Sequence, residues 1–281
     1  MNASEPYAFL TEPERFADGS VGNVATIFLT NRECPWRCVM CDLWRNTLPA
    51  PVKPGDIPRQ IEYALARLAP AKQVKLYNSG SFFDRGAIPA EDYPHIAALL
   101  RGFERVIVEC HPALVGDASL RFRDLLGCDL EVAMGLETAH PEVLARLNKR
   151  MTLPQYADAA ATLQRYGIAL RSFVLVRPPF LQEEEEALHW ACRSIDFAQD
   201  CGATAVSLIP TRGGNGAMET LAQTGAFAPP TVQSFEDAFA YGLTRRRGRV
   251  FVDLWDFERT ATCPACVHDR RDRLQRMNLS Q

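Results

Sequence analysis

The sequence predicts an α/β protein that folds as a partial (β/α)6 TIM-like barrel with a short C-terminal extension. Short apolar segments alternate with amphipathic helical patterns along most of the 281-residue chain. The apolar segments are too hydrophobic to face water, which is typical of parallel strands covered by helices. Six such repeats occur at the spacing of a barrel that needs eight to close, so we expect an incomplete barrel.

Six apolar segments are expected to form the strands of this barrel. They lie at residues 23–29, 73–78, 105–110, 129–136, 169–176 and 205–209. In barrels of this kind the chemistry gathers at the C-terminal ends of the strands. The residues that directly follow these segments are therefore the candidates for a functional site.

The expected helices follow the first five strands in order. They lie at residues 57–68, 93–103, 119–126, 153–166 and 183–200. Asp56 is suited to cap the first helix, in which Ile57 and Ile61 begin an apolar pattern with helical spacing. Gly167 is suited to end the fourth helix, because glycine tolerates the left-handed conformation that often follows a helix.

We divide the chain into three parts on this basis. An N-terminal segment at residues 1–22 leads into the barrel at residues 23–225, and a C-terminal extension with a CxxC motif follows at residues 226–281. Hydrophobic residues make up 47% of the chain and charged residues 23%, which is an ordinary globular composition.

The net charge of −3 provides no general basic field that would hold nucleic acid. Two local basic runs could still form an RNA-facing patch, or they could be solvated surface shared with nearby acids. They consist of Arg245, Arg246, Arg247 and Arg249, and of Arg270, Arg271, Arg273 and Arg276.

We expect a cytoplasmic protein without a membrane segment. The first residues lack the basic region and apolar run of a signal peptide, and no stretch of about 18 apolar residues occurs. Nine cysteines in such a chain favour metal or redox chemistry over disulfides.

Three cysteines follow the first expected strand with the spacing C-x3-C-x2-C. Three thiolates this close in one loop can bind one [4Fe–4S] cluster through Cys34, Cys38 and Cys41. Because a cube usually takes four cysteines, three leave one iron open to bind and activate a ligand. The alternative is a zinc site, which would need a fourth ligand, with the CxxC motif near the C-terminus as its source.

Small and polar residues follow the second and third strands. Gly80, between Ser79 and Ser81, permits the backbone to approach a ligand closely, although a simple turn would also explain it. Cys110 and His111 end the third strand and would lie near the barrel mouth. There Cys110 could ligate metal, donate hydrogen to a substrate radical or line the pocket, or it could be a small buried side chain.

Charged residues accompany the fourth and fifth strands. Glu137 ends the fourth strand, where a carboxylate is costly without a partner, and Lys149 follows it. Arg171 lies within an otherwise apolar strand. We expect it to face a polar barrel lumen, bind an anion there and lie near the substrate, with an arginine at the edge of the barrel as the alternative.

The C-terminal CxxC motif consists of Cys263 and Cys266, with His268 nearby. Two ligands do not make a metal site, so the motif needs partners such as His268, Cys110 or His111. Three interpretations stay open: half of a zinc site, part of an auxiliary iron–sulfur centre, or a redox or structural pair without metal.

The three-cysteine motif is that of the radical S-adenosylmethionine (SAM) superfamily, and other segments extend the resemblance. The chain resembles the radical SAM enzymes of archaeosine formation and the radical SAM domain of Elongator-type catalytic subunits, from about residue 23 to the C-terminus. The segments that carry this resemblance are LTNRECPWRCVMC, VKLYNSGSFFD, LEVAMGLETAHPEVLARLNKRMT, ALRSFVLVRPPF and CPAC.

The resemblance implies a partial barrel and reductive cleavage of SAM at a [4Fe–4S] cluster. The resulting 5′-deoxyadenosyl radical would abstract hydrogen from a substrate, for which a modified tRNA nucleoside is implied. A flavodoxin or ferredoxin would supply the electron. Two alternatives are a radical SAM enzyme that acts on a small molecule or natural product, and a non-enzymatic zinc or iron–sulfur scaffold.

The resemblance also implies residues that contact SAM. Met40 stands before the third cysteine, where the family usually has an aromatic residue, and could pack on the adenine. Residues 79–81 stand where many members have Gly-Gly-Glu, whose backbone meets the amino group of SAM. Glu137 would contact the ribose or the amino group. Lys149 could contact the carboxylate or lie at the surface.

Overall fold

Eight strands form one curved sheet in the computed structural model, which describes residues 2–259, 263 and 265–281. The strands lie in the sheet in their order along the chain. β1 (Ala8–Arg15) pairs antiparallel with β2 (Val21–Phe28), and every later pair is parallel. The others are β3 (Gln73–Tyr77), β4 (Arg105–Cys110), β5 (Asp129–Glu137), β6 (Ala169–Val176), β7 (Ala205–Pro210) and β8 (Arg249–Val252).

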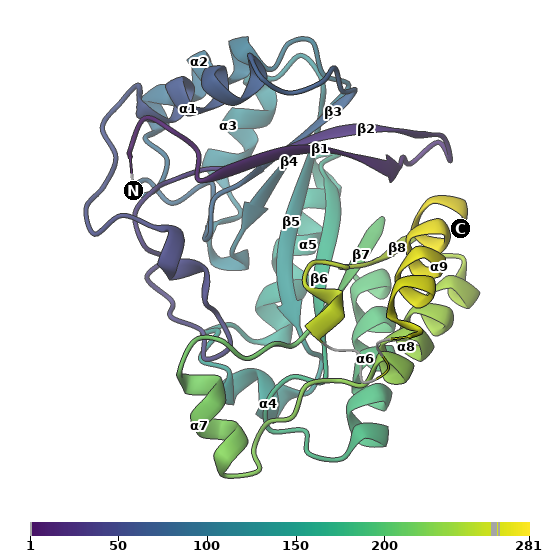
Figure 1. The fold of residues 1–281 in the computed structure, drawn as a ribbon. Coiled ribbons are helices and arrows are strands. Elements are labelled where there is room, and N and C mark those ends of the chain that lie inside the picture. Colours follow the sequence, from purple (N-terminus) through teal and green to yellow (C-terminus); the bar gives the residue numbers. More distant parts are fainter. Residues whose placement is uncertain (1, 260–262, 264) are drawn as a thin grey trace.

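Helices connect the parallel strands and cover the sheet. α1, α2 and α3 lie beside the first strands of the sheet, whereas α6 and α8 pack beside the last ones (Figure 1). The α-helices are α1 (Asp56–Leu65), α2 (Tyr93–Leu99), α3 (Asp117–Leu125), α4 (Pro141–Arg146), α5 (Leu153–Arg165), α6 (Glu184–Asp200), α7 (Ala217–Gln223), α8 (Val232–Arg245) and α9 (Val267–Ser280). Short 3-10 helices are η1 (Leu43–Asn46), η2 (Ala90–Asp92), η3 (Pro112–Leu114) and η4 (Phe257–Arg259).

The partial barrel predicted from the sequence is confirmed, and all six expected strands are present as β2 to β7. The sheet gains one strand at each edge. β1 lies in the predicted N-terminal segment, and its sequence AFLTEPER contains three charged residues and a proline. β8 lies in the predicted C-terminal extension and has only four residues, RVFV. Both are edge strands, and edge strands tolerate proline and charged residues. Neither therefore has a long run of apolar residues by which it could be predicted.

The two edges of the sheet approach each other at the N-terminal end of the barrel. α9 packs against both β1 and β8. Arg249 donates a hydrogen bond to the carbonyl oxygen of Arg15 (3.4 Å), and Arg15 donates one to that of Leu279 (3.2 Å). This end of the incomplete barrel is thereby covered by protein.

The alternation of side chains along each strand separates the core from the barrel lumen. In β5, Leu130, Val132 and Met134 belong to the apolar core, whereas Glu131 lies on the opposite face and pairs with cations inside the barrel. Because the parallel strands are covered on their outer face by helices, the apolar residues there need no polar partner. Among the described residues, no helix is long and apolar enough to cross a membrane.

Candidate active site

The loop that follows β2 holds three cysteines, and we call residues 34–41 the cysteine loop. Cys34, Cys38 and Cys41 are free thiols and half-buried. Burial raises the pKa of Cys34, and it raises that of Cys38 to about 11 and that of Cys41 to about 12. Thiols in such surroundings stay protonated at neutral pH unless a metal binds them in place of the proton.

The loop after β3 lies directly against the cysteine loop. A Cβ atom added at Gly80 would lie 3.3 Å from the Cβ atom of Cys34 and 3.8 Å from its Sγ atom, so the glycine packs closely on the Cys34 side chain. Ser79 has a φ of 55°, which is uncommon for a residue with a side chain. Its hydroxyl lies 3.3 Å from that of Tyr7, at the N-terminal side of β1.

Glu109, near the end of β4, is hydrogen-bonded to the loop after β3. Its carboxylate accepts a hydrogen bond from the backbone N–H of Asn78 (2.8 Å), and the N–H groups of Ser79 and Gly80 also stabilise its charge. Burial of the carboxyl group raises the pKa of Glu109 to about 7, against the lowering effect of these N–H donors. Glu109 was missed in the sequence, although it ends a strand with a carboxylate as Glu137 does.

Glu137 and Lys149 form an ion pair at the end of β5. Their charged atoms are 2.6 Å apart, and both side chains are almost enclosed. Glu137 has a φ of 65° and lies at an irregularity in the pairing of β5 with β6. The charge of Lys149 also acts on Cys38 and Cys34, where it opposes the rise in their pKa. The structure therefore brings both residues to the cysteine loop.

Trp36 attaches the cysteine loop to the end of β4. Its indole stacks on the imidazole of His111, with ring centroids 4.0 Å apart and an angle of 9° between the rings. The Nε2 atom of His111 lies 2.9 Å from the carbonyl oxygen of Lys149. Burial lowers the pKa of His111 to about 4, so the ring is neutral at physiological pH. His111 thus connects the cysteine loop, on which it stacks, to the segment at Lys149, to which it is hydrogen-bonded.

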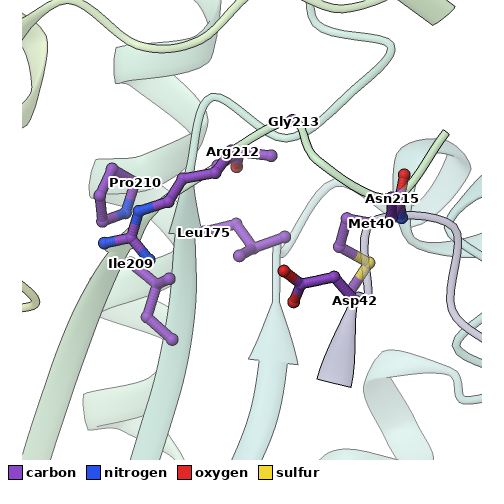
Figure 2. A pocket seen from close by; sticks show the side chains of 9 residues that line it. Met40, Asp42, Leu175, Ile209, Pro210, Arg212, Gly213 and Asn215 are labelled. Atoms are coloured by element: carbon purple, nitrogen blue, oxygen red, sulfur yellow. The ribbon is translucent and has the colours of Figure 1, made fainter. Parts of the chain in front are cut away.

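A cavity of about 120 Å³ lies between the cysteine loop and the ends of β6 and β7. Met40 and Asp42 line one side, and Leu175 and Ile209 line the other (Figure 2). The Asp42 carboxylate is directed toward Leu175 across this space (Figure 2). Met40 was predicted to contact a ligand, whereas Asp42 was missed because it follows the motif on an exposed stretch of loop.

Residues 28–191 of this chain match the family model of the radical SAM superfamily. The chain belongs to that superfamily. The matched segment runs from the end of β2 into α6 and includes the cysteine loop, the loop after β3 and the Glu137–Lys149 pair. Of the two alternatives to a tRNA enzyme, the non-enzymatic scaffold is thereby set aside, because the superfamily consists of enzymes that bind a [4Fe–4S] cluster and SAM.

Two similar relatives come from archaea. The chain is 28% identical to archaeosine synthase subunit beta of Methanosarcina acetivorans over 244 residues, which cover 82% of this chain and 70% of the relative. It is 25% identical to an uncharacterised protein of Methanocaldococcus jannaschii over 247 residues, which cover 82% of this chain and 67% of that one.

Solved structures show the same fold at low sequence identity. The archaeal Elp3 of Methanocaldococcus infernus matches with a TM-score of 0.58 and 11% identity, over 78% of this chain and 59% of that chain. Coproporphyrinogen III oxidase of Escherichia coli, a radical SAM enzyme, matches with a TM-score of 0.52 and 11% identity, over 82% of this chain and 53% of that one. The radical SAM chain described here thus spans little more than half of either protein.

The cysteine loop of this radical SAM chain fits an iron–sulfur cube. Its three thiols are free, lie on one loop and influence one another electrostatically. A cube distributes its cysteine ligands over different irons, so their sulfur atoms need not converge on one ion. Among the described residues, no three His, Cys, Asp or Glu side chains are gathered closely enough to hold a single metal ion.

Cys110 lies apart from the cavity that Met40 lines. It is 3% exposed, and its Sγ atom lies 3.1 Å from the carbonyl oxygen of His111 and 3.6 Å from the hydroxyl of Ser81. Burial raises its pKa to about 12. These contacts are those of a small packing residue beneath the loop after β3, and its role as a hydrogen donor stays a prediction.

Arg171 faces the lumen, but the anions that it binds belong to the chain itself. It pairs with Glu14 of β1 and with Glu131 of β5, each at 2.6 Å, and is only 2% exposed. It stands near the start of β6, about 17 Å before the end of the strand at 3.3 Å per residue. The prediction of a substrate-side arginine is therefore corrected: its charge is already compensated at the opposite end of the barrel.

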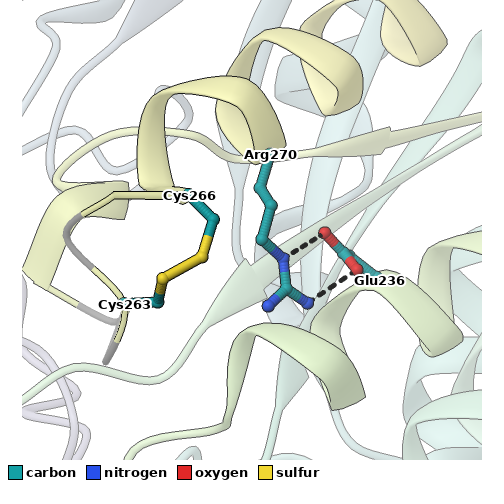
Figure 3. The surroundings of a disulfide bond; sticks show 4 residues. All are labelled: Glu236, Cys263, Cys266 and Arg270. Atoms are coloured by element: carbon teal, nitrogen blue, oxygen red, sulfur yellow. Dashed lines mark hydrogen bonds and ion pairs between the residues drawn. A yellow bond between two sulfur atoms is a disulfide. The ribbon is translucent and has the colours of Figure 1, made fainter.

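The CxxC cysteines are bonded to each other. Cys263 and Cys266 form a disulfide directly before α9, beside the Arg270–Glu236 ion pair (Figure 3). Metal ligation requires a thiolate, which a disulfide does not offer. The predicted zinc or auxiliary iron–sulfur centre at this motif is therefore not shown, and the interpretation as a pair without metal agrees with the disulfide.

Several arginines of the two basic runs are paired with acids. Arg245 binds Asp196 and Arg247 binds Asp200, at 2.9 and 2.6 Å. Arg270 and Arg273 both bind Glu236, at 2.8 and 2.6 Å. Because α8 ends at Arg245, shortly before β8 begins, the first run lies at the end of the barrel opposite the cysteine loop. The paired arginines of these runs are therefore not free cations for a ligand.

Proposed function

We propose that this chain is a radical SAM enzyme that acts on a modified nucleoside of tRNA. Cys34, Cys38 and Cys41 would bind the [4Fe–4S] cluster. When bound, the cluster and SAM supply a 5′-deoxyadenosyl radical that removes a hydrogen atom from the substrate. The observation that carries the proposal is the assembly of three free thiols on one loop, with Cys34 packed against Gly80 and the Lys149 charge nearby.

The residues around the cysteine loop would position SAM. Glu109 accepts a hydrogen bond from the backbone N–H of Asn78 and so would help to hold the segment from Ser79 to Ser81 in place. The Lys149–Glu137 pair offers a cation and a carboxylate, which complement the carboxylate and the amino group of SAM. Met40 would cover the adenine from the side of the cavity. Holding the reacting hydrogen beside the radical and excluding water would be the protein's part in catalysis.

Similarity to archaeosine synthase subunit beta supports tRNA as the substrate. The match covers 82% of this chain and 70% of the relative. The electron would come from a flavodoxin or a ferredoxin. Residues that touch the nucleoside are expected at the cavity beside Met40, which opens toward the barrel mouth.

A small-molecule substrate is the second candidate, and one observation favours it. Four arginines of the basic runs that would bind the tRNA backbone already pair with Asp196, Asp200 or Glu236. Phosphate binding depends on unpaired cations that release counterions from the nucleic acid, so these runs contribute little to such a contact.

The enzyme class is tested by anaerobic reconstitution with iron and sulfide, reduction with dithionite and addition of SAM. We expect 5′-deoxyadenosine from the wild type and none from the triple variant Cys34→Ala, Cys38→Ala, Cys41→Ala. Zinc in place of iron and no 5′-deoxyadenosine would refute the proposal. The substrate is then tested by comparing total tRNA with free nucleosides and amino acids. Stimulation by tRNA alone supports the first candidate, and stimulation by a free small molecule supports the second.

A further inference from the structure

Three arginines beside the cysteine loop form no ion pair within the part of the chain that the structure describes. They are Arg45 in η1, Arg146 at the end of α4 and Arg150 shortly after it, and all three residues are exposed. They differ in this respect from the arginines of α8 and α9, several of which already bind a carboxylate. An exposed guanidinium group without such a partner is free to bind an anion.

Arg146 and Arg150 are held beside the cysteine loop by Asn148, which lies between them in the chain. Asn148 donates through Nδ2 to the carbonyl oxygens of Trp36 (3.2 Å) and Arg37 (3.0 Å). It has a φ of 56°, a left-handed conformation that asparagine tolerates better than most residues. The backbone, rather than a salt bridge, therefore brings the two arginines to the barrel mouth.

Arg45 lies where the cysteine loop meets α7, which is at the same end of the barrel as α4 (Figure 1). Asn215, just before α7, donates through Nδ2 to the carbonyl oxygen of Cys41 (3.1 Å). The charge of Arg45 acts on Glu219 of α7. The Glu219 carboxylate is hydrogen-bonded to backbone N–H groups of the loop before this helix, and it forms no ion pair with Arg45.

Exposed apolar side chains gather at the same end of the barrel. In the described part of the chain, six large apolar residues are exposed, and three of them follow the cysteine loop or β8: Leu43 (39%), Trp44 (47%) and Trp255 (62%). The carbonyl oxygen of Trp255 accepts a hydrogen bond from Arg212, which lines the cavity at the barrel mouth. The cavity is thus bordered by indole rings as well as by unpaired cations.

Unpaired arginines and exposed indoles around one opening suit a single-stranded segment of RNA. Guanidinium groups bind phosphate oxygens, and each phosphate contact releases counterions from the nucleic acid. Bases that are not stacked in a helix offer their faces to aromatic side chains. A small molecule held in a cavity of about 120 Å³ would leave these exposed side chains uncovered. A polynucleotide that places one nucleoside there would cover them with the neighbouring nucleotides.

We propose that the rim of the barrel mouth binds a single-stranded segment of tRNA and presents one of its nucleosides to the cavity beside Met40. The arginines bind the phosphates on either side of that nucleoside, and the indoles stack on neighbouring bases. The inference rests on the proposed function, for which it names the surface that binds the substrate. This surface, the mouth rim, consists of Trp44, Arg45, Arg146, Arg150 and Trp255.

The test is the binding of fluorophore-labelled total tRNA to the reconstituted protein, measured by fluorescence anisotropy without SAM. The triple variant Arg45→Gln, Arg146→Gln, Arg150→Gln removes three charges of the mouth rim. We expect it to bind tRNA at least about tenfold more weakly at about 0.15 M salt. The slope of log K against log salt should become shallower by about 2, since each phosphate contact of a single strand contributes about 0.7.

Trp44→Ala separates the contribution of stacking from that of charge. We expect about tenfold weaker binding, which is typical of the loss of one stacked base, with an unchanged salt slope. Because Trp44 is exposed, the change should not affect folding, and the iron content after reconstitution checks this. Wild-type affinity in both this variant and the arginine variant would overturn the inference.

A matched control removes three charges from the paired runs through Arg245→Gln, Arg247→Gln and Arg273→Gln. We expect this control to bind tRNA nearly as the wild type does, because these arginines already bind carboxylates. An equal loss in the control would show that net charge, rather than the mouth rim, determines binding, and would overturn the inference. Normal tRNA binding with slower reduction by flavodoxin in the mouth-rim variant would assign the surface to the electron donor instead, which also overturns it.

The inference and the proposed function fail in different ways. A wild type that binds tRNA through the mouth rim but forms no 5′-deoxyadenosine would refute the radical chemistry and leave the RNA surface standing. A wild type that forms 5′-deoxyadenosine with a free small molecule and binds no tRNA would overturn the inference and leave the radical chemistry standing.

Discussion

The ammonium nitrogen of Lys149 lies 2.6 Å from a carboxylate oxygen of Glu137, and the two side chains are 12% and 9% exposed. Lys149→Met would leave the Glu137 carboxylate buried without a partner. We expect the free energy of unfolding to fall by about 3 kcal/mol, the usual cost of breaking a buried ion pair from one side. Denaturant titration of the protein would measure it.

The double variant Glu137→Gln, Lys149→Met is the matched control for this ion pair. It removes both charges, and we expect it to regain most of the stability that Lys149→Met loses. A single variant as stable as the wild type would show that Glu137 has another partner or remains hydrated.

The ion network around Arg171 should make the N-terminal end of the barrel sensitive to substitution. Burial alone would raise the pKa of Glu131, but Arg171 and Arg249 outweigh it and lower this pKa to about 2. The pKa of Glu14 is likewise held well below its ordinary value by Arg171 and Lys75 against the effect of burial. Arg171→Met would leave Glu14 and Glu131 to repel each other, with an expected loss of about 4 kcal/mol at pH 7.

The pH dependence of this loss gives a second measurement. In the wild type the folded carboxylates have lowered pKa values, so their contribution is present above about pH 4.5 and is lost as the pH falls toward 2. In Arg171→Met, protonation relieves the repulsion, so the stability deficit should shrink between pH 7 and pH 4. An equal deficit at both pH values would argue against charge as its cause.

Ionisation of the Glu109 carboxyl group should lower the free energy of unfolding as the pH rises. Burial raises its pKa from 4.5 to about 7, so the folded state binds this proton more tightly than the unfolded state. Its contribution is therefore present below about pH 4.5 and is lost as the pH rises through about 7. Relative to the wild type, Glu109→Gln should be more stable at pH 8 than at pH 5, as measured by denaturant titration at both. His111 titrates in both proteins, so its effect cancels in the difference.

Because Cys263 and Cys266 form a disulfide, we predict that the CxxC motif is not needed for metal binding. We expect the double variant Cys263→Ser, Cys266→Ser to retain the iron content and the 5′-deoxyadenosine yield of the wild type, because these sulfur atoms bond to each other. Iron and zinc analysis after reconstitution, with the three-cysteine variant as the negative control, would measure this. A loss of bound metal in the serine variant would restore the hypothesis of a second centre.

Local patterns were enough to predict most of the barrel. The segments expected at residues 105–110 and 169–176 have the same bounds as β4 and β6. Parallel strands that are buried on both faces need continuous apolar sequence, which is visible without knowledge of any partner. The C-x3-C-x2-C spacing is equally local, because all three ligands stand on one loop.

The edge strands and the contacts of the lumen could not be predicted in this way. Arg171 pairs with Glu14, 157 residues earlier in the chain, only because the curvature of the sheet brings β1 across the lumen from β6. In a barrel without β1, the same arginine would keep Glu131 of β5 as a partner and lose Glu14. Nothing in the apolar strand around Arg171 indicates which carboxylate it meets.

The sequence by itself determined the α/β repeats, the order of the strands and the three cysteines that would bind a cluster, since each depends on residues close together in the chain. Tertiary structure decided that Cys263 and Cys266 bond to each other, that Arg171 pairs with carboxylates of the chain, and that Asn148 and Asn215 bind the cysteine loop. The partner of a buried charge or amide depends on which groups folding brings within hydrogen-bond distance. Groups that are far apart in the sequence come that close only in the folded protein.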